Sequence, residues 1–157
     1  MRNIKTIFIL VLSLILLLAV SCSNEDKTGE TETIETIDAK DFPQELLGTY
    51  RDENVASAGY SGVNFDTKVS YDETTKKNKI EGTWLQDGTT DGQGQGCSIE
   101  KWKKTTKGGN PIKLEGESSG SGGAKYTVSY DYASGTLSGT YTHPTDGTWS
   151  FNGKKIS

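Results

Sequence analysis

The chain has 157 residues and a formal net charge of −4 at pH 7, and 32% of its residues are hydrophobic. This length suits one small folded domain, and the acidic balance without a basic patch argues against nucleic acid as a partner. Two cysteines and a single histidine are too few for a disulfide framework or a zinc site, so we expect no cofactor and no metal.

The first 22 residues combine a short basic start, an apolar run and an exit of small residues. Arg2 and Lys5 precede the apolar run 7–20, and Ser21 and Cys22 follow it. This order is typical of a secretory signal, and the apolar run is too short to span a membrane comfortably.

The position of Cys22 directly after the small residues resembles the lipobox of bacterial lipoproteins. The resemblance implies that the thiol receives a diacylglyceryl group and that cleavage leaves Cys22 as the new N-terminus. We therefore expect a signal peptide over 1–21 and a lipid-anchored protein of the bacterial cell envelope, with the outer membrane or cell surface favoured. An uncleaved signal anchor, or ordinary cleavage beside an incidental cysteine, is the alternative.

The segment after Cys22 is acidic and poor in apolar residues. Residues 23–41 contain seven acidic and two basic side chains, and Ile34 and Ile37 are their sizeable apolar residues. Such a segment buries too little apolar surface to order itself. We therefore predict a flexible acidic tether over 22–41, which separates the lipid from a folded domain over 42–157.

From Phe42 onward, apolar and polar residues alternate in runs that predict strands with one buried face. Turn signals rich in Gly, Asn and Asp separate the runs. Short connections favour an all-β fold, an antiparallel up-and-down meander of about eight strands closed into a barrel, with an open sandwich as the alternative. The predicted strands are 46–52, 60–71, 79–86, 97–104, 111–118, 124–132, 136–142 and 147–152.

A short unit with glycine two residues before an aromatic residue recurs in these strands. It reads Leu47-Gly48-Thr49-Tyr50, Glu81-Gly82-Thr83-Trp84 and Ser138-Gly139-Thr140-Tyr141. The unit is similar to the strand signatures of small calycin-type barrels, the bacterial lipocalin-like and avidin-like proteins. In a strand, such a glycine indicates a bend or a place where a neighbouring side chain lies over the backbone.

Aromatic side chains are the best candidates for a ligand surface, because they pack flat on sugars and apolar molecules. Trp84 shares a strand face with Ile80, which favours core packing over ligand contact for Trp84. Trp102 has Glu100 and Lys104 on its own face, so we expect it to be exposed or near a rim. The ligand-binding candidates are Trp84, Trp102, Trp149, Tyr130 and Tyr141.

Other features offer less chemistry, and we expect no catalytic residue. His143 is the single histidine and precedes a proline, and no nucleophile elbow is present. The acidic residues spaced along 87–94 lack the terminal Glu of an EF-hand, so we predict a long mobile hairpin loop there. Cys97 begins a predicted strand, and we expect it to be buried.

These patterns predict a non-enzymatic envelope lipoprotein whose barrel binds a small hydrophobic or amphipathic ligand. The alternative is a surface interaction module, an adhesin or an enzyme inhibitor, with a packed barrel. For that alternative, Ser121-Gly122-Gly123-Ala124-Lys125-Tyr126 resembles the cleft-inserting segment of membrane-bound lysozyme inhibitors. The expected partners are the membrane, through the lipid, and either a small molecule or a protein.

Overall fold

The computed structural model of the chain describes residues 30–53, 63–86 and 89–157. The expected signal peptide, Cys22 and the first part of the acidic segment lie outside these residues. The described residues form an all-β fold with one sheet of ten strands, every pair of which is antiparallel. Within these residues, no helix has the length and apolar character needed to cross a membrane.

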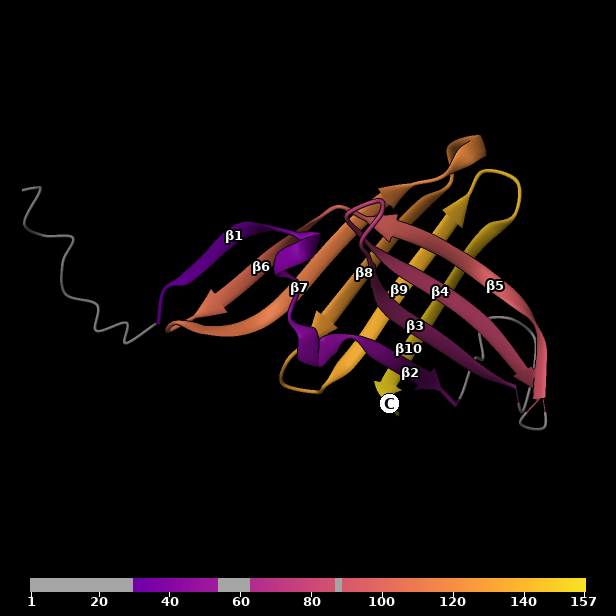
Figure 1. Ribbon diagram of the computed structural model, residues 1–157, viewed down its shortest axis with the longest axis horizontal. Helices are drawn as coiled ribbons and strands as arrows, with labels where there is room; N and C mark the ends of the chain where they lie inside the picture. Colours follow the sequence, from indigo (N-terminus) through magenta and orange to yellow (C-terminus); the bar gives the residue numbers. More distant parts are fainter. Residues whose placement is uncertain (1–29, 54–62, 87–88) are drawn as a thin grey trace, which may run out of the picture. The chain divides into compact units, whose positions relative to one another are not determined.

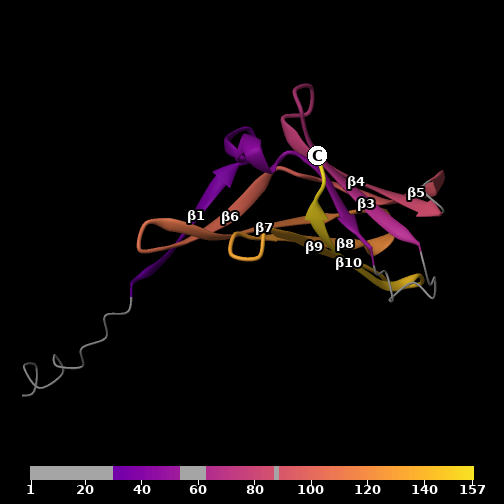
Figure 2. The same ribbon diagram turned by 90° about the horizontal axis from the view of Figure 1, so that it is seen from below.

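The strand order across the sheet is β1-β6-β7-β8-β9-β10-β2-β3-β4-β5. The sheet curls into a half-barrel, and in Figure 2 β3, β4 and β5 lie above β8, β9 and β10. The strands are β1 Glu32–Asp38, β2 Gly48–Asp52, β3 Asn64–Asp72, β4 Lys77–Gln86, β5 Thr89–Ile99, β6 Lys101–Lys107, β7 Asn110–Ser119, β8 Lys125–Asp131, β9 Thr136–His143 and β10 Gly147–Lys155. Short 3-10 turns are η1 Ala39–Asp41, η2 Gln44–Leu46 and η4 Ser121–Gly123.

The prediction of an all-β antiparallel sheet is confirmed, but the predicted closed barrel is wrong (Figure 1). The sheet has ten strands rather than eight, and β1 and β5 form its two edges. Closure would require these two edge strands, β1 and β5, to pair with each other. Each has one paired neighbour among the described strands: β1 pairs with β6 from Glu32↔Lys107 to Asp38↔Lys101, and β5 pairs with β4.

Strand β1 also corrects the prediction of a flexible tether over 22–41, because its residues are ordered against β6. Alone, this acidic segment has too few apolar residues to fold, but β6 is rich in lysine and lies directly beside it. Glu35 Oε1 lies 2.9 Å from Lys104 Nζ, and Thr33 and Thr106 share a hydrogen bond between their hydroxyls. Such cross-strand pairs stabilise a sheet. The compact unit therefore begins at Thr31 and not at Phe42.

One end of the half-barrel is filled by side chains, and we call it the packed end. Phe42 and Leu46, at the two 3-10 turns after β1, are buried over the concave face of the sheet. The ring of Phe42 lies 4.7 Å from that of Trp102. We call the segment of η1 and η2 the plug. The hydroxyl of Tyr50, on β2, donates to the Leu46 carbonyl oxygen at 2.8 Å and so holds the plug against β2. The core cluster here consists of Phe42, Leu46, Tyr50, Val69, Ile80, Ile99, Trp102, Leu114, Val128 and Leu137.

Two similar turns close hairpins at this end, and both follow the sequence Val-Ser-Tyr-Asp. Asp72 Oδ1 accepts the backbone N–H groups of Thr74 and Thr75, and Asp131 Oδ1 accepts that of Ser134. The turns therefore use an aspartate to satisfy backbone donors that the strands leave unpaired. The backbone hydrogen bonds lower the pKa of Asp72 below the ordinary value, and the pKa of Asp131 is lowered by the Ser134 hydroxyl, which donates to it at 2.7 Å, and then by the Ser134 N–H.

The region around β5 differs from its prediction in two ways. Residues 89–94 of the loop predicted over 87–94 belong to β5, and the predicted strand 97–104 is broken at Glu100. Glycine makes this strand hard to recognise in the sequence. Gly94 and Gly96 have no side chain and so cannot show the apolar–polar alternation that is typical of a strand. Glycine is needed at 94, where a Cβ atom would lie 2.5 Å from Cε2 of Phe65.

Candidate functional site

The other end of the half-barrel holds a cavity of about 340 Å³, which we call the open pocket. Strands β3, β4, β5, β8, β9 and β10 contribute residues to it. Its volume lies at the lower end of the range of about 300–1,000 Å³ that is usual for small-molecule sites. The aromatic lining residues are Phe65, Trp84, Tyr126, Tyr141, Trp149 and Phe151.

The ring contacts form two groups: one links β3 and β4 to β10, and the other lies on β8 and β9. Phe65 contacts Trp84 at a centroid distance of 4.6 Å, and Trp84 meets Trp149 edge-on at 6.4 Å. On β8 and β9, Tyr126 and Tyr141 lie 5.0 Å apart. Tilted and edge-on pairs of this kind are favourable arrangements of aromatic rings. They hold the pocket walls in fixed positions.

Glycines let these rings lie close against the sheet. A Cβ atom at Gly139, on β9, would collide with the ring of Phe151 on β10. Gly139 belongs to the recurring glycine–aromatic unit, so the prediction that a side chain lies over such a glycine is confirmed there. The rings of Phe151 and Phe65 are 5.9 Å apart, and together they line the pocket beside Trp84.

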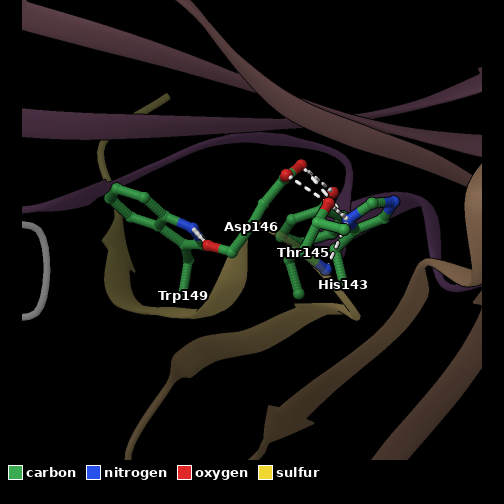
Figure 3. Close-up of polar contacts among 5 residues, drawn as sticks. His143, Thr145, Asp146 and Trp149 are labelled. Atoms are coloured by element: carbon green, nitrogen blue, oxygen red, sulfur yellow. Dashed lines mark hydrogen bonds and ion pairs between the residues drawn. The ribbon is translucent and has the colours of Figure 1, made fainter.

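The turn between β9 and β10 forms part of the pocket mouth, and Figure 3 shows its polar contacts. His143 Nδ1 lies 2.8 Å from Thr145 Oγ1 and 3.3 Å from Asp146 Oδ2. The Thr145 hydroxyl donates to Asp146 Oδ1 at 2.8 Å. The indole N–H of Trp149 donates to the Asp146 carbonyl oxygen at 3.2 Å. These contacts fix both Trp149 and the Asp146 carboxylate beside the pocket.

The contacts of His143 do not form a catalytic relay. In such a relay, a carboxylate orients one ring nitrogen while the other nitrogen takes a proton from a hydroxyl. Here the same nitrogen, Nδ1, faces both Thr145 and Asp146. Within residues 30–53, 63–86 and 89–157, no three His, Cys, Asp or Glu side chains are grouped so that they could hold a metal ion.

Deeper in the pocket, the polar groups are few. The Thr67 side chain is buried, and its hydroxyl has no hydrogen-bond partner among the described residues. Burial raises the pKa of the Cys97 thiol to about 12. The thiol is therefore protonated at neutral pH and contributes soft, apolar lining rather than a nucleophile. Burial likewise raises the pKa of the Tyr126 hydroxyl.

The structure separates the five predicted ligand-binding candidates between the two ends. Trp84, Tyr141 and Trp149 line the open pocket. Tyr130 packs against the core, with its ring 6.1 Å from that of Tyr50. Trp102 is fully buried, so the prediction that it is exposed is wrong. Its charged neighbours in sequence do not decide its exposure, because η1 and the following residues cover it.

The pocket residues that were not among the candidates include Phe65, Thr67, Tyr126, Phe151 and Asp146. The alternation along β3 placed Phe65 and Thr67 on one face, and this pattern could have identified them. Nothing comparable marks Asp146, which reaches the mouth because of the turn that carries it. The segment 121–126, predicted as a possible inhibitor loop, forms η4 and the start of β8, and its Tyr126 lines the pocket.

Comparison of the chain with models of known protein families, with curated proteins and with solved structures found no match. The class of the molecule is therefore defined by its own geometry. It is an all-β half-barrel that is packed at one end and has an aromatic pocket at the other.

Proposed function

We propose that the open pocket binds a small hydrophobic or amphipathic molecule and that the protein is held at the bacterial cell envelope by a lipid on Cys22. The observation that carries the binding proposal is the aromatic pocket of about 340 Å³. Water in such a pocket meets mainly apolar surface, so its replacement by an apolar ligand is favourable.

The pocket has features that favour binding over simple incomplete packing. Its rings are positioned by one another and by Gly94 and Gly139, so little ordering is needed when a ligand enters. The buried hydroxyl of Thr67 is left without a described partner, and an oxygen or nitrogen atom of a ligand could supply one. These features support a binding protein more than an interaction module with a packed interior.

Native mass spectrometry would test the binding proposal. We would use residues 22–157 with Cys22→Ser, which include the whole compact unit, after incubation with a lipid extract of bacterial cells. We expect a discrete added mass that weakens in Trp149→Ala, because Trp149 lines the pocket. Ile34→Ala is the matched control, because Ile34 is an exposed apolar residue on β1.

A bare protein mass under gentle conditions would contradict the binding proposal. It would favour the alternative, a surface module that acts through its loops as an adhesin or enzyme inhibitor. An adduct that is retained equally by wild type and Trp149→Ala would place the ligand outside the open pocket.

The anchoring proposal rests on the lipobox-like sequence that ends at Cys22. It is tested by feeding labelled palmitate to a bacterial host that produces the full chain. We expect label on the wild type and none on Cys22→Ala. Equal labelling of the two proteins would contradict lipidation at Cys22.

A further inference from the structure

The open pocket has a negative side chain among its described lining residues and no positive one. Among its described lining residues, Asp146 is the charged one, and neither lysine nor arginine occurs. Burial raises the pKa of three lining groups, the Cys97 thiol and the Tyr126 and Tyr141 hydroxyls, so all three are neutral at physiological pH. An anionic ligand would therefore meet a negative carboxylate and no compensating cation.

Two aromatic side chains contact Asp146. The Tyr141 hydroxyl lies 3.4 Å from Asp146 Oδ2, and the indole of Trp149 is tied to the Asp146 backbone. The faces of tyrosine and tryptophan rings attract cations through their quadrupoles, and tryptophan does so most strongly. A carboxylate next to such rings is an environment that suits an ammonium group, above all a quaternary one.

The depth of these groups sets the orientation of the ligand. The Asp146 side chain is 54% exposed and Trp149 is 37% exposed, so both lie at the mouth. Phe65, Ile80 and Val128 are buried and line the interior. A ligand that satisfies both regions has an apolar tail in the interior and a positive head at the mouth.

We propose that the open pocket selects cationic amphiphiles, with the ammonium head held by Asp146, Trp149 and Tyr141. This inference rests on the proposed binding function and adds the chemical class of the ligand. Among the described residues, the basic side chain that contacts the Asp146 carboxylate is His143. The Thr145 hydroxyl also donates to this carboxylate, so the head group joins an existing set of contacts at the mouth.

The test uses three probes with the same eight-carbon tail: octyltrimethylammonium, octyl glucoside and octyl sulfate, each below its micelle concentration. Isothermal titration calorimetry of residues 22–157 with Cys22→Ser gives the three affinities. We expect the cationic probe to bind about tenfold more tightly than the sulfate, because cation–π contacts with partial desolvation favour the cation.

Two substitutions assign this preference to the mouth. Asp146→Asn should weaken the cationic probe about three- to fivefold and leave octyl glucoside unchanged, since an exposed charge pair contributes modestly. Trp149→Leu keeps apolar contact but removes the ring face, so it should reduce the preference for the cation over the glucoside. Glu73→Gln is the charge-matched control, because Glu73 lies in the exposed turn between β3 and β4.

Three other results would contradict the proposed ligand class, the binding function or the role of Asp146. Similar affinities for the three probes would contradict charge selection and leave the proposed binding function intact. Binding of none of them would count against both. A preference for the cation that survives Asp146→Asn would remove Asp146 from the head-group site.

Discussion

At the packed end of the half-barrel, Phe42 and Leu46 fill the space between the curled strands, and Trp102 is fully buried beneath them. At the open pocket, the same sheet carries six aromatic rings, but no plug like η1 and η2 fills the space between them, and among the described residues Asp146 is the lining residue that lies outside the strands. Curled strands with inward aromatic residues therefore do not by themselves make a closed core. The difference between a core and a binding pocket is a short plug of chain, here η1 and η2.

The largest expected difference between the ends concerns their tryptophans. Trp102→Ala should lower the free energy of unfolding by about 3–5 kcal/mol, because it leaves a cavity in a fully buried site. Trp149→Ala should cost about 1 kcal/mol or less, because Trp149 is partly exposed. Urea unfolding followed by circular dichroism measures both. Equal losses would mean that the open pocket contributes to stability as the packed end does.

The next prediction concerns the glycines against which the aromatic rings of the pocket pack. Gly139→Ala should destabilise the fold by about 1–3 kcal/mol, because the new methyl group would overlap the ring of Phe151. It should also weaken ligand binding. Gly92→Ala is the control, since a Cβ atom there meets nothing within 4 Å, and it should change stability by less than about 0.5 kcal/mol. A harmless Gly139→Ala would show that the Phe151 ring is free to move.

A smaller effect of opposite sign is expected at Thr67. Thr67→Val removes a buried hydroxyl without a described partner and keeps the shape of the side chain, so it should stabilise the empty protein by about 1 kcal/mol. Thermal unfolding measures the gain. Thr33→Val, at an exposed threonine whose hydroxyl is paired with Thr106, should show no gain. A loss of stability in Thr67→Val would mean that the hydroxyl is satisfied in the empty pocket.

The smallest effect belongs to the turns at the packed end. The pKa values of Asp72 and Asp131 are lowered in the folded protein by hydrogen bonds from turn backbone or hydroxyl groups. Their contribution is therefore present above the unfolded pKa of about 3.9 and is lost as pH falls through the lower folded values. Unfolding measured from pH 6 down to pH 2 should show less acid sensitivity in Asp72→Asn with Asp131→Asn. Unchanged sensitivity would show that other groups cause the acid response.

The sequence pattern predicted those parts of the fold in which side chains alternate within one strand. It predicted β3, β7, β8 and β9 closely, because buried or half-buried residues recur on one face of each strand, and it also predicted β10, most of whose residues are exposed. It missed β1 because this strand depends on the lysine-rich β6, which is distant in sequence. It missed most of β5 because glycines conceal its alternation. Both omissions explain why closure of the barrel was expected.

The residues of the open pocket were also predicted in part. Trp84, Tyr141 and Trp149 could be proposed from residue type and strand face. Trp102 was misplaced, because its burial depends on Phe42 and the turns around it rather than on its own strand. Asp146 could not be proposed, because the β9–β10 turn decides where its carboxylate lies.

The chain has three tryptophans, and the fold distributes them as natural optical reporters. Trp102 donates its indole N–H to buried Asn78 at 2.7 Å, so its emission and its protection from aqueous quenchers follow the integrity of the packed end. Trp84 and Trp149 border the open pocket, where a bound molecule would change their surroundings. Quencher access and emission wavelength, recorded on one unlabelled sample, thus separate occupancy of the pocket from unfolding of the protein.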